Sequence, residues 1–157
     1  MMRPPFALVL VATLFLWAGL IIGISFLEAP LKFTAPHITL ALGVGIGRVV
    51  FHALNKVEIG LYAGAAVCAI YLRVPGRVGG ALVLLAAVLL LQTFWLLPAL
   101  DVRAEALLHG HPPPASSLHL LYIGVEAVKL CLVLGTGTLA YLALHRPPPR
   151  LASPTGF

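Results

Sequence analysis

The sequence predicts an all-α membrane protein, folded as one antiparallel bundle of four transmembrane helices. Hydrophobic residues make up 61% of the 157 residues and charged residues only 10%, with a mean hydropathy of +1.04. Soluble domains carry about a quarter charged residues, so this composition excludes that class. Four apolar runs approach or exceed the roughly 20 residues that a spanning helix needs. We therefore expect a single transmembrane domain over residues 1–145.

The first predicted helix covers residues 6–27. The run from Phe6 to Leu27 is apolar and uncharged, with Arg3 before it, and so resembles a secretory signal peptide. It is longer than the apolar region of such a peptide, and no A-x-A-like cleavage site follows it. We expect a helix that is retained in the membrane.

The second predicted helix covers residues 48–72. Its purely apolar part, Ile59 to Leu72, is too short to cross the hydrocarbon layer by itself, so the helix is expected to begin near Arg48. The preceding stretch from Leu40 to Gly47 is apolar and has glycine at positions 43, 45 and 47. We predict that this stretch is an interfacial or re-entrant segment shielded from lipid.

The third and fourth predicted helices cover residues 78–97 and 118–144. Pro98 closes the third, and Ser116 or Ser117 is expected to be the N-cap of the fourth. The short segment 73–77 predicts a tight turn, which makes the second and third helices antiparallel neighbours. The proline-rich tail, residues 146–157, is predicted to be disordered.

Basic residues in the loops favour an orientation with both termini in the cytoplasm. The cytoplasmic side then carries five basic residues: Arg3, Arg73, Arg77, Arg146 and Arg150. The other side carries four: Lys32, Arg48, Lys56 and Arg103. The formal net charge of +5 is spread among loop ends, which suits contact with lipid head groups in the bilayer and argues against nucleic acid as a partner.

Two opposite charges lie midway along the fourth run. Insertion scales assign a cost of roughly 2.5 to 3.5 kcal/mol to an ionisable residue at the centre of a spanning helix. Glu126 and Lys129 are therefore expected to have interaction partners or a function. His119, Tyr122, Glu126 and Lys129 recur at steps of three, four and three, which places them on one stripe of a helix.

The antiparallel topology places most polar residues of the spans in one half of the membrane, the extracytoplasmic half in the predicted orientation. Gln92, Thr93 and Asp101 of the third helix belong to this half. We predict a polar cavity there, lined by Glu28, Arg48, Asn55, Glu58, Tyr62, His119, Tyr122, Glu126 and Lys129. Such a cavity would bind or pass a small polar solute, an ion or a proton, or serve assembly with a larger complex. In the alternative reading, Glu126 and Lys129 only neutralise each other or join neighbouring helices.

Metal and redox chemistry have few candidate ligands. The spacing of His109 and His111 is able to chelate copper or zinc, but no cysteine, methionine cluster or carboxylate accompanies the pair. His52 and His119 are candidate axial haem ligands, although no C-x-x-C-H motif is present. We predict no metal site and no cofactor, and keep a haem- or copper-binding redox protein as an alternative. Cys68 and Cys131 are expected to act as small hydrophobic residues.

Several short motifs resemble a family of uncharacterised bacterial four-span integral membrane proteins. These are Trp17-Ala18-Gly19, the stretch from Ser25 to Phe33, and the stretch from Gly47 through Asn55 to Glu58. The stripe on the fourth helix fits the same resemblance. It implies a bundle in the bacterial inner membrane and no established activity.

A narrower resemblance concerns the second helix. Arg48, Asn55 and Glu58 are spaced as in MAPEG enzymes, four-helix trimers that bind glutathione. This resemblance implies, as an alternative, a glutathione-dependent enzyme, but the third helix has no arginine or tyrosine to match that family. We expect a non-enzymatic role. Trp17, Gly19 and Gly23 are expected to serve helix packing, and the glycine-rich faces suit a homo-oligomer.

Overall fold

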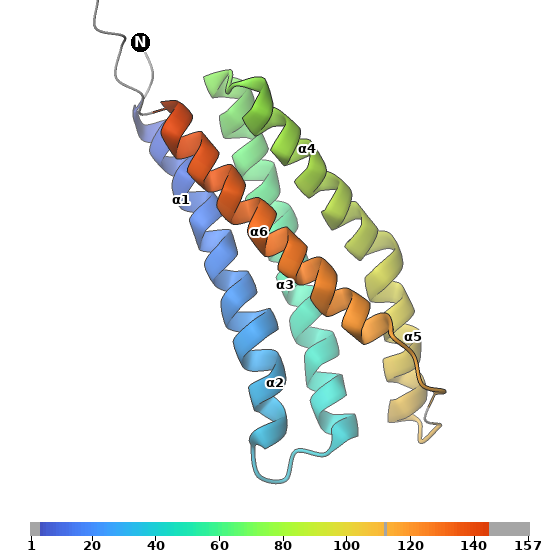
Figure 1. The fold of residues 1–157 in the computed structure, drawn as a ribbon. Coiled ribbons are helices and arrows are strands. Elements are labelled where there is room, and N and C mark those ends of the chain that lie inside the picture. The colour runs from blue at the N-terminus through green and yellow to red at the C-terminus, as the bar shows by residue number, and fades with distance from the viewer. Residues whose placement is uncertain (1–3, 112, 145–157) are drawn as a thin grey trace, which may run out of the picture.

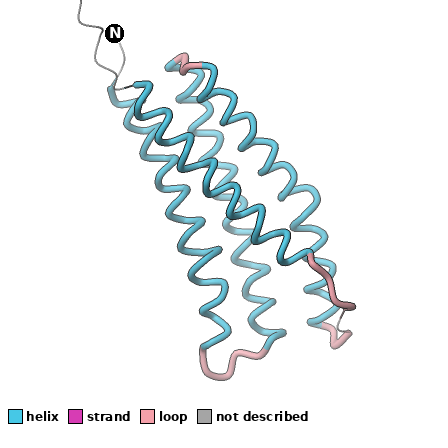
Figure 2. The backbone as a smooth tube through the Cα atoms, viewed as in Figure 1, coloured by secondary structure: helices cyan, strands magenta, loops and turns pink. Residues whose placement is uncertain are grey.

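The computed structural model describes residues 4–111 and 113–144, which form four long helical spans (Figure 1). The prediction of an all-α, antiparallel four-helix bundle is confirmed. Figure 2 shows that the described loops lie at the two ends of the bundle. The predicted disordered tail, residues 146–157, lies outside the described residues.

Each span is long and apolar enough to cross a membrane. The first consists of α1 (Pro4–Leu20), η1 (Ile21–Glu28), α2 (Ala29–Leu31) and η2 (Lys32–Thr34). The second is α3 (Leu40–Leu72). The third consists of α4 (Gly76–Leu91), η3 (Gln92–Leu96) and α5 (Leu97–Leu108), and the fourth is α6 (Leu118–Leu144). Many large apolar side chains on their outer faces are exposed, as contact with lipid requires.

The spans alternate in direction. α1 packs against α3 and α6, and α4 packs against α6 (Figure 1). We call the end of the bundle with residues 73–75 the turn end, and the end with residues 35–39 and 109–117 the loop end. The start of α1 and the end of α6 lie at the turn end (Figure 1).

Two spans contain a π-helical segment just before a proline. In η1 the Ala29 amide donates to the carbonyl of Ile24, and after η3 the Leu97 amide donates to the carbonyl of Gln92. Pro30 and Pro98 lack an amide proton and would clash with the carbonyl four residues earlier in an α-helix, and the wider π turn absorbs this clash. The prediction that Pro98 closes the third helix is therefore wrong, since this span continues to Leu108.

The segment predicted to be interfacial or re-entrant is helical and continuous with α3. Thr39 Oγ1 caps this helix by accepting from the Leu42 amide at 3.2 Å, so α3 begins at Leu40. Gly43 lies under the ring of Phe33, and a Cβ at this position would clash with the ring. The glycines thus let the end of the first span approach α3 closely.

The turn and cap chemistry agrees with the sequence. Arg73 adopts a left-handed conformation, with φ of 50°, and the Val74 amide donates to the Ala69 carbonyl at 3.2 Å. Ser116 Oγ accepts from the Leu118 amide at 3.1 Å at the start of α6. Ser117 directly precedes α6 and its carbonyl accepts from the Leu121 amide, so Ser117 occupies the N-cap position and the Ser116 hydroxyl supports the first turn.

The bundle has two apolar clusters. The larger one fills the turn-end half and includes Leu14, Leu85 and Val133, all fully buried. The smaller one lies toward the loop end and contains Leu96, Leu97 and Tyr122. The deepest polar residues of the spans lie between them.

Candidate functional site

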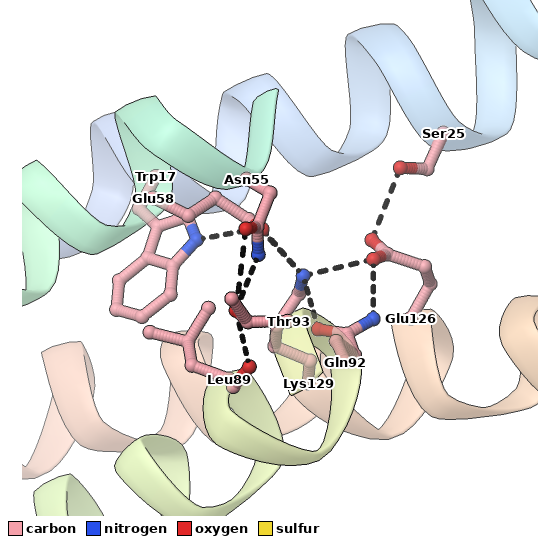
Figure 3. Close-up of polar contacts among 9 residues, drawn as sticks. All are labelled: Trp17, Ser25, Asn55, Glu58, Leu89, Gln92, Thr93, Glu126 and Lys129. Carbon is pink, nitrogen blue, oxygen red and sulfur yellow. Dashed lines mark hydrogen bonds and ion pairs between the residues drawn. The ribbon is translucent and has the colours of Figure 1, made fainter. Parts of the chain in front are cut away.

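A buried group of polar side chains joins all four spans, and we call it the ion cluster. It consists of Trp17, Ser25, Glu58, Gln92, Glu126 and Lys129 (Figure 3). At its centre Lys129 Nζ donates to Glu126 Oε1, Gln92 Oε1 and Glu58 Oε2, each at 2.8 Å. Glu58 Oε1 lies 2.6 Å from the same nitrogen. The ammonium thus contacts helices α3 and α6 and the η3 segment.

The remaining bonds of the ion cluster hold the two carboxylates. Trp17 Nε1 donates to Glu58 Oε1 at 2.9 Å. Gln92 Nε2 donates to Glu126 Oε1 at 2.7 Å, and Ser25 Oγ donates to Glu126 Oε2 at 3.0 Å. Within residues 4–111 and 113–144, every buried side-chain nitrogen or oxygen has a hydrogen-bond partner. The cluster therefore meets the main condition under which charges are tolerated in a membrane interior.

The charges of the ion cluster do not cancel. Lys129 is 0% exposed, and Glu58 and Glu126 are each 1% exposed. With both carboxylates ionised, one ammonium faces two negative charges. Moving each ion out of water costs several kcal/mol, which close pairing offsets only in part. One negative charge is then left without a matching positive charge inside the cluster.

A second polar link lies beside the ion cluster. Asn55 Nδ2 donates to Thr93 Oγ1 at 3.0 Å, and Thr93 Oγ1 also donates to the Leu89 carbonyl at 2.7 Å (Figure 3). This link ties α3 to the π-helical segment η3. It thereby fixes the turn from which Gln92 reaches Lys129.

A cavity of about 610 Å³ opens on the loop-end side of the ion cluster. Its walls come from η1, α2, η2, α3, α5 and α6 and are mostly apolar, with Phe26, Phe33, Phe51, Leu97, Leu100, Leu107 and Ile123 among them. Glu126 and Ser25 are the deepest wall residues on α6 and η1. Glu126 thus belongs both to the cavity wall and to the ion cluster.

Charged side chains surround the wider part of the cavity. Arg48 Nε lies 3.2 Å from Asp101 Oδ1, and His52 Nε2 lies 2.7 Å from Asp101 Oδ2. Lys32 Nζ lies 3.4 Å from Glu28 Oε2 and 5.5 Å from the centre of the Phe51 ring. These groups are partly exposed, so screening by solvent weakens their pairing.

Arg103 also lines this part of the cavity, and it donates to the carbonyl of Pro114. This bond joins α5 to the loop that precedes α6. The wall thereby includes part of the loop end as well as the helices.

The residues predicted to line a polar cavity fall into two groups. Arg48, His119, Tyr122 and Glu126 line the cavity. The others lie beside it: Glu28 pairs with Lys32, Asn55 bonds to Thr93, Tyr62 packs edge-on against Trp17, and Glu58 and Lys129 lie in the ion cluster.

Sequence reasoning missed three members of the ion cluster. The sequence alone predicts helix packing for Trp17, a place among the polar residues but no role for Gln92, and no polar role for Ser25. A buried tryptophan needs an acceptor for its indole N–H, and an amide in an apolar span needs a partner. These two rules single out Trp17 and Gln92, whereas no sequence signal singles out Ser25.

The metal and redox candidates are scattered. In the part of the chain that the structure describes, no three or more His, Cys, Asp or Glu side chains are grouped to hold a metal ion. His52 and His119 both line the cavity, with His52 bonded to Asp101. His109 Nδ1 lies 2.8 Å from the Glu105 carbonyl oxygen. Cys68 is buried and Cys131 is exposed on α6.

Comparisons of the chain with protein-family models, with curated proteins and with solved structures found no match. The function is therefore inferred from the cavity and the ion cluster themselves.

Proposed function

We propose that this protein binds a small, largely apolar solute that carries a polar group, in the cavity beside Glu126. The role is non-enzymatic, either binding alone or passage of the solute. The observation that carries this proposal is the cavity of about 610 Å³ whose apolar walls end at a buried carboxylate. Ligand sites typically enclose about 300 to 1,000 Å³, with apolar walls and a few polar groups that orient the ligand.

The polar end of the cavity suits a hydrogen-bond donor on the solute. Lys129 and Gln92 engage Glu126 Oε1, whereas Oε2 accepts the bond from Ser25 at the cavity wall. A hydroxyl or amine of the solute is able to bond to this second oxygen. Lys129 has its three donors directed to protein acceptors, so it holds the cluster together and does not contact the solute.

We propose that the cavity faces the extracytoplasmic side of a bacterial inner membrane. In the sequence, five basic residues precede, join or follow the spans on the turn-end side, against four on the loop-end side: Lys32, Arg48, Lys56 and Arg103. The positive-inside rule then favours the turn end in the cytoplasm. Arg3, Arg146 and Arg150, which support the same orientation, lie outside the described residues.

Cysteine labelling tests both the cavity and its orientation. In a variant with Cys68 and Cys131 replaced by alanine, Ser25→Cys is expected to react with a charged, membrane-impermeant thiosulfonate added from the extracytoplasmic side. Leu27→Cys is the control, because Leu27 lies nearer the end of the span but is 57% exposed on the outer face. If Ser25→Cys reacts from neither side of sealed vesicles, the cavity is closed to water and the proposal fails.

A cavity-filling substitution tests binding of the solute. Ala104 lines the cavity, whereas Ala53 on α3 is exposed outside it. The neutral apolar probe N-phenyl-1-naphthylamine is expected to bind saturably to the wild type and to Ala53→Trp in lipid nanodiscs, and not to Ala104→Trp. Equal saturable binding to both tryptophan variants would show that the probe occupies lipid or another surface.

The alternative functions stay predictions. Of the three residues that resemble the MAPEG pattern, Arg48 lines the cavity, whereas Asn55 and Glu58 bond to Thr93 and to the ion cluster. Calorimetry with glutathione and a visible absorption spectrum of purified protein test the glutathione and haem hypotheses. Light scattering of the purified protein tests the predicted homo-oligomer.

A further inference from the structure

We infer that the ion cluster binds one exchangeable proton and that Glu126 Oε2 is the atom that carries it. The inference concerns the cluster and does not depend on the identity of the solute or on its binding. It follows from the count of charges and from which hydrogen-bond partners are able to reverse their roles.

The charge count calls for one proton. Glu58, Glu126 and Lys129 are almost completely buried and together carry one net negative charge when all three are ionised. Adding a proton to one carboxylate gives a neutral cluster, which removes the cost of a net charge in the membrane interior. The proton comes from water, so no further reactant is needed.

The hydrogen-bond partners decide where the proton binds. Both oxygens of Glu58 face donors that cannot accept, namely the Lys129 ammonium and the Trp17 indole N–H. Glu126 Oε1 likewise faces Lys129 and the Gln92 amide nitrogen. Glu58 Oε1 and Glu126 Oε1 each already face two donors, so a proton on either oxygen would displace one of them. Glu58 Oε2 faces the ammonium and, among the described residues, has no hydrogen-bond partner able to accept a proton from it.

Glu126 Oε2 is different because its partner is a hydroxyl. Ser25 Oγ lies 3.0 Å away and is able either to donate or to accept. When Glu126 is protonated at Oε2, the direction of this bond reverses and the bond is kept. Protonation at Oε2 therefore loses no hydrogen bond.

The fold gives this proton access from one side. Ser25, Tyr122 and Glu126 all line the cavity, which opens toward the loop end. Toward the turn end, the apolar cluster that includes Leu14, Leu85 and Val133 separates Glu126 from the opposite surface. Exchange is then expected with water on the cavity side.

Other ionisable groups surround Glu126. Lys129 contacts it within the cluster, Glu58 binds the same ammonium, and Tyr122 and His119 precede it on α6. Across the cavity lie Arg48 and His52 of α3, Asp101 and Arg103 of α5, and Lys32 of η2. The segments η1 and η3 present Ser25 and Gln92, which do not titrate.

Infrared difference spectroscopy of the full-length protein in lipid tests the inference without added solute. Between alkaline and acidic buffer, the wild type is expected to gain the carbonyl band of a protonated carboxylic acid, shifted in deuterated water. Glu126→Gln and Glu58→Gln are both expected to lose this band at the pH where the wild type shows it, because either change leaves one negative charge opposite Lys129. Glu105→Gln, at an exposed glutamate, is the matched control and is expected to keep the band.

Two milder variants locate the proton. Ser25→Ala removes the partner of Glu126 Oε2, and Trp17→Phe removes a partner of Glu58. We expect Ser25→Ala to shift the frequency of the carbonyl band and Trp17→Phe to leave it in place. A shift in Trp17→Phe as large as that in Ser25→Ala, or no shift in either, overturns the assignment to Oε2. Absence of the band from the folded wild type at every pH overturns proton binding itself.

Discussion

Replacing Lys129 by methionine is expected to lower the free energy of unfolding by about 3 to 5 kcal/mol, the loss typical when one partner of a buried ion pair is removed. Methionine keeps most of the length and volume of the side chain, so the change removes the charge and its donors rather than the packing. The ratio of folded to unfolded protein should then fall by a factor of about a hundred to a few thousand. Glu58 and Glu126 remain buried without the ammonium that joins them.

The magnitude follows from the two ion pairs. Lys129 Nζ lies 2.6 Å from Glu58 Oε1 and 2.8 Å from Glu126 Oε1. With both carboxylates ionised and an effective dielectric constant of about 20, each pair contributes about 6 kcal/mol of attraction. Desolvation of the ammonium offsets several kcal/mol of that attraction. Replacing Lys129 by methionine also removes this desolvation cost. The net loss is therefore a fraction of the attraction.

Unfolding of the protein in mixed micelles, titrated with sodium dodecyl sulfate and followed by circular dichroism, measures this loss. Lys56→Met makes the same chemical change at an exposed position of α3 and is expected to stay within about 0.5 kcal/mol of the wild type. Combining Lys129→Met with Glu58→Gln and Glu126→Gln removes all three charges and should recover part of the loss. A loss below about 1 kcal/mol for Lys129→Met, or no recovery in the triple variant, would refute the role of the pairing.

Two further predictions use the same titration. Trp17→Phe removes the bond to Glu58 and is expected to cost about 1.5 to 3 kcal/mol, as for hydrogen bonds to charged groups; an unchanged midpoint would mean that the carboxylate does not need the indole. Gly137→Leu should lower the free energy of unfolding by about 1 to 3 kcal/mol. Even a Cβ added at Gly137 would lie only 3.3 Å from the Phe15 ring, and leucine adds further atoms beyond it. Gly135→Leu, on the open face of α6, is its control, and equal losses in the two variants would rule out close packing of α6 on α1 as the cause.

Hydropathy alone predicted the four spans and their antiparallel order, because uninterrupted apolar runs leave a membrane chain few other structures. The extent of the spans was harder to predict. Proline at position 98 normally ends a helix, and only the π turn before it allows the third span to continue. Likewise, nothing local distinguishes a glycine-rich interfacial segment from the first turns of α3. Whether a helix ends or continues at these positions depends on contacts with other spans, such as that between Phe33 and Gly43.

The candidate site was predictable in its location more than in its partners. The spacing of Glu126 and Lys129 on one helix predicted their proximity, and the structure places them 2.8 Å apart. The contact of Lys129 with Glu58 joins residues 71 positions apart in the sequence, and helical periodicity carries no information about such a pair. The division between an ion cluster and a mostly apolar cavity also depends on the rotation of each helix. That rotation is set by packing rather than by local sequence.

The central position of Lys129 has a consequence for biogenesis. The ribosome delivers the spans in order, so α1, α3 and α4 enter the bilayer before the only ammonium of the cluster is made. Until then the Glu58 carboxylate lacks its cation, and a three-span intermediate is penalised in lipid. The last span arrives with Glu126 beside Lys129, three residues apart, and so brings its own counterion into the membrane. Docking of α6 is therefore the step at which the buried Glu58 carboxylate gains its counterion.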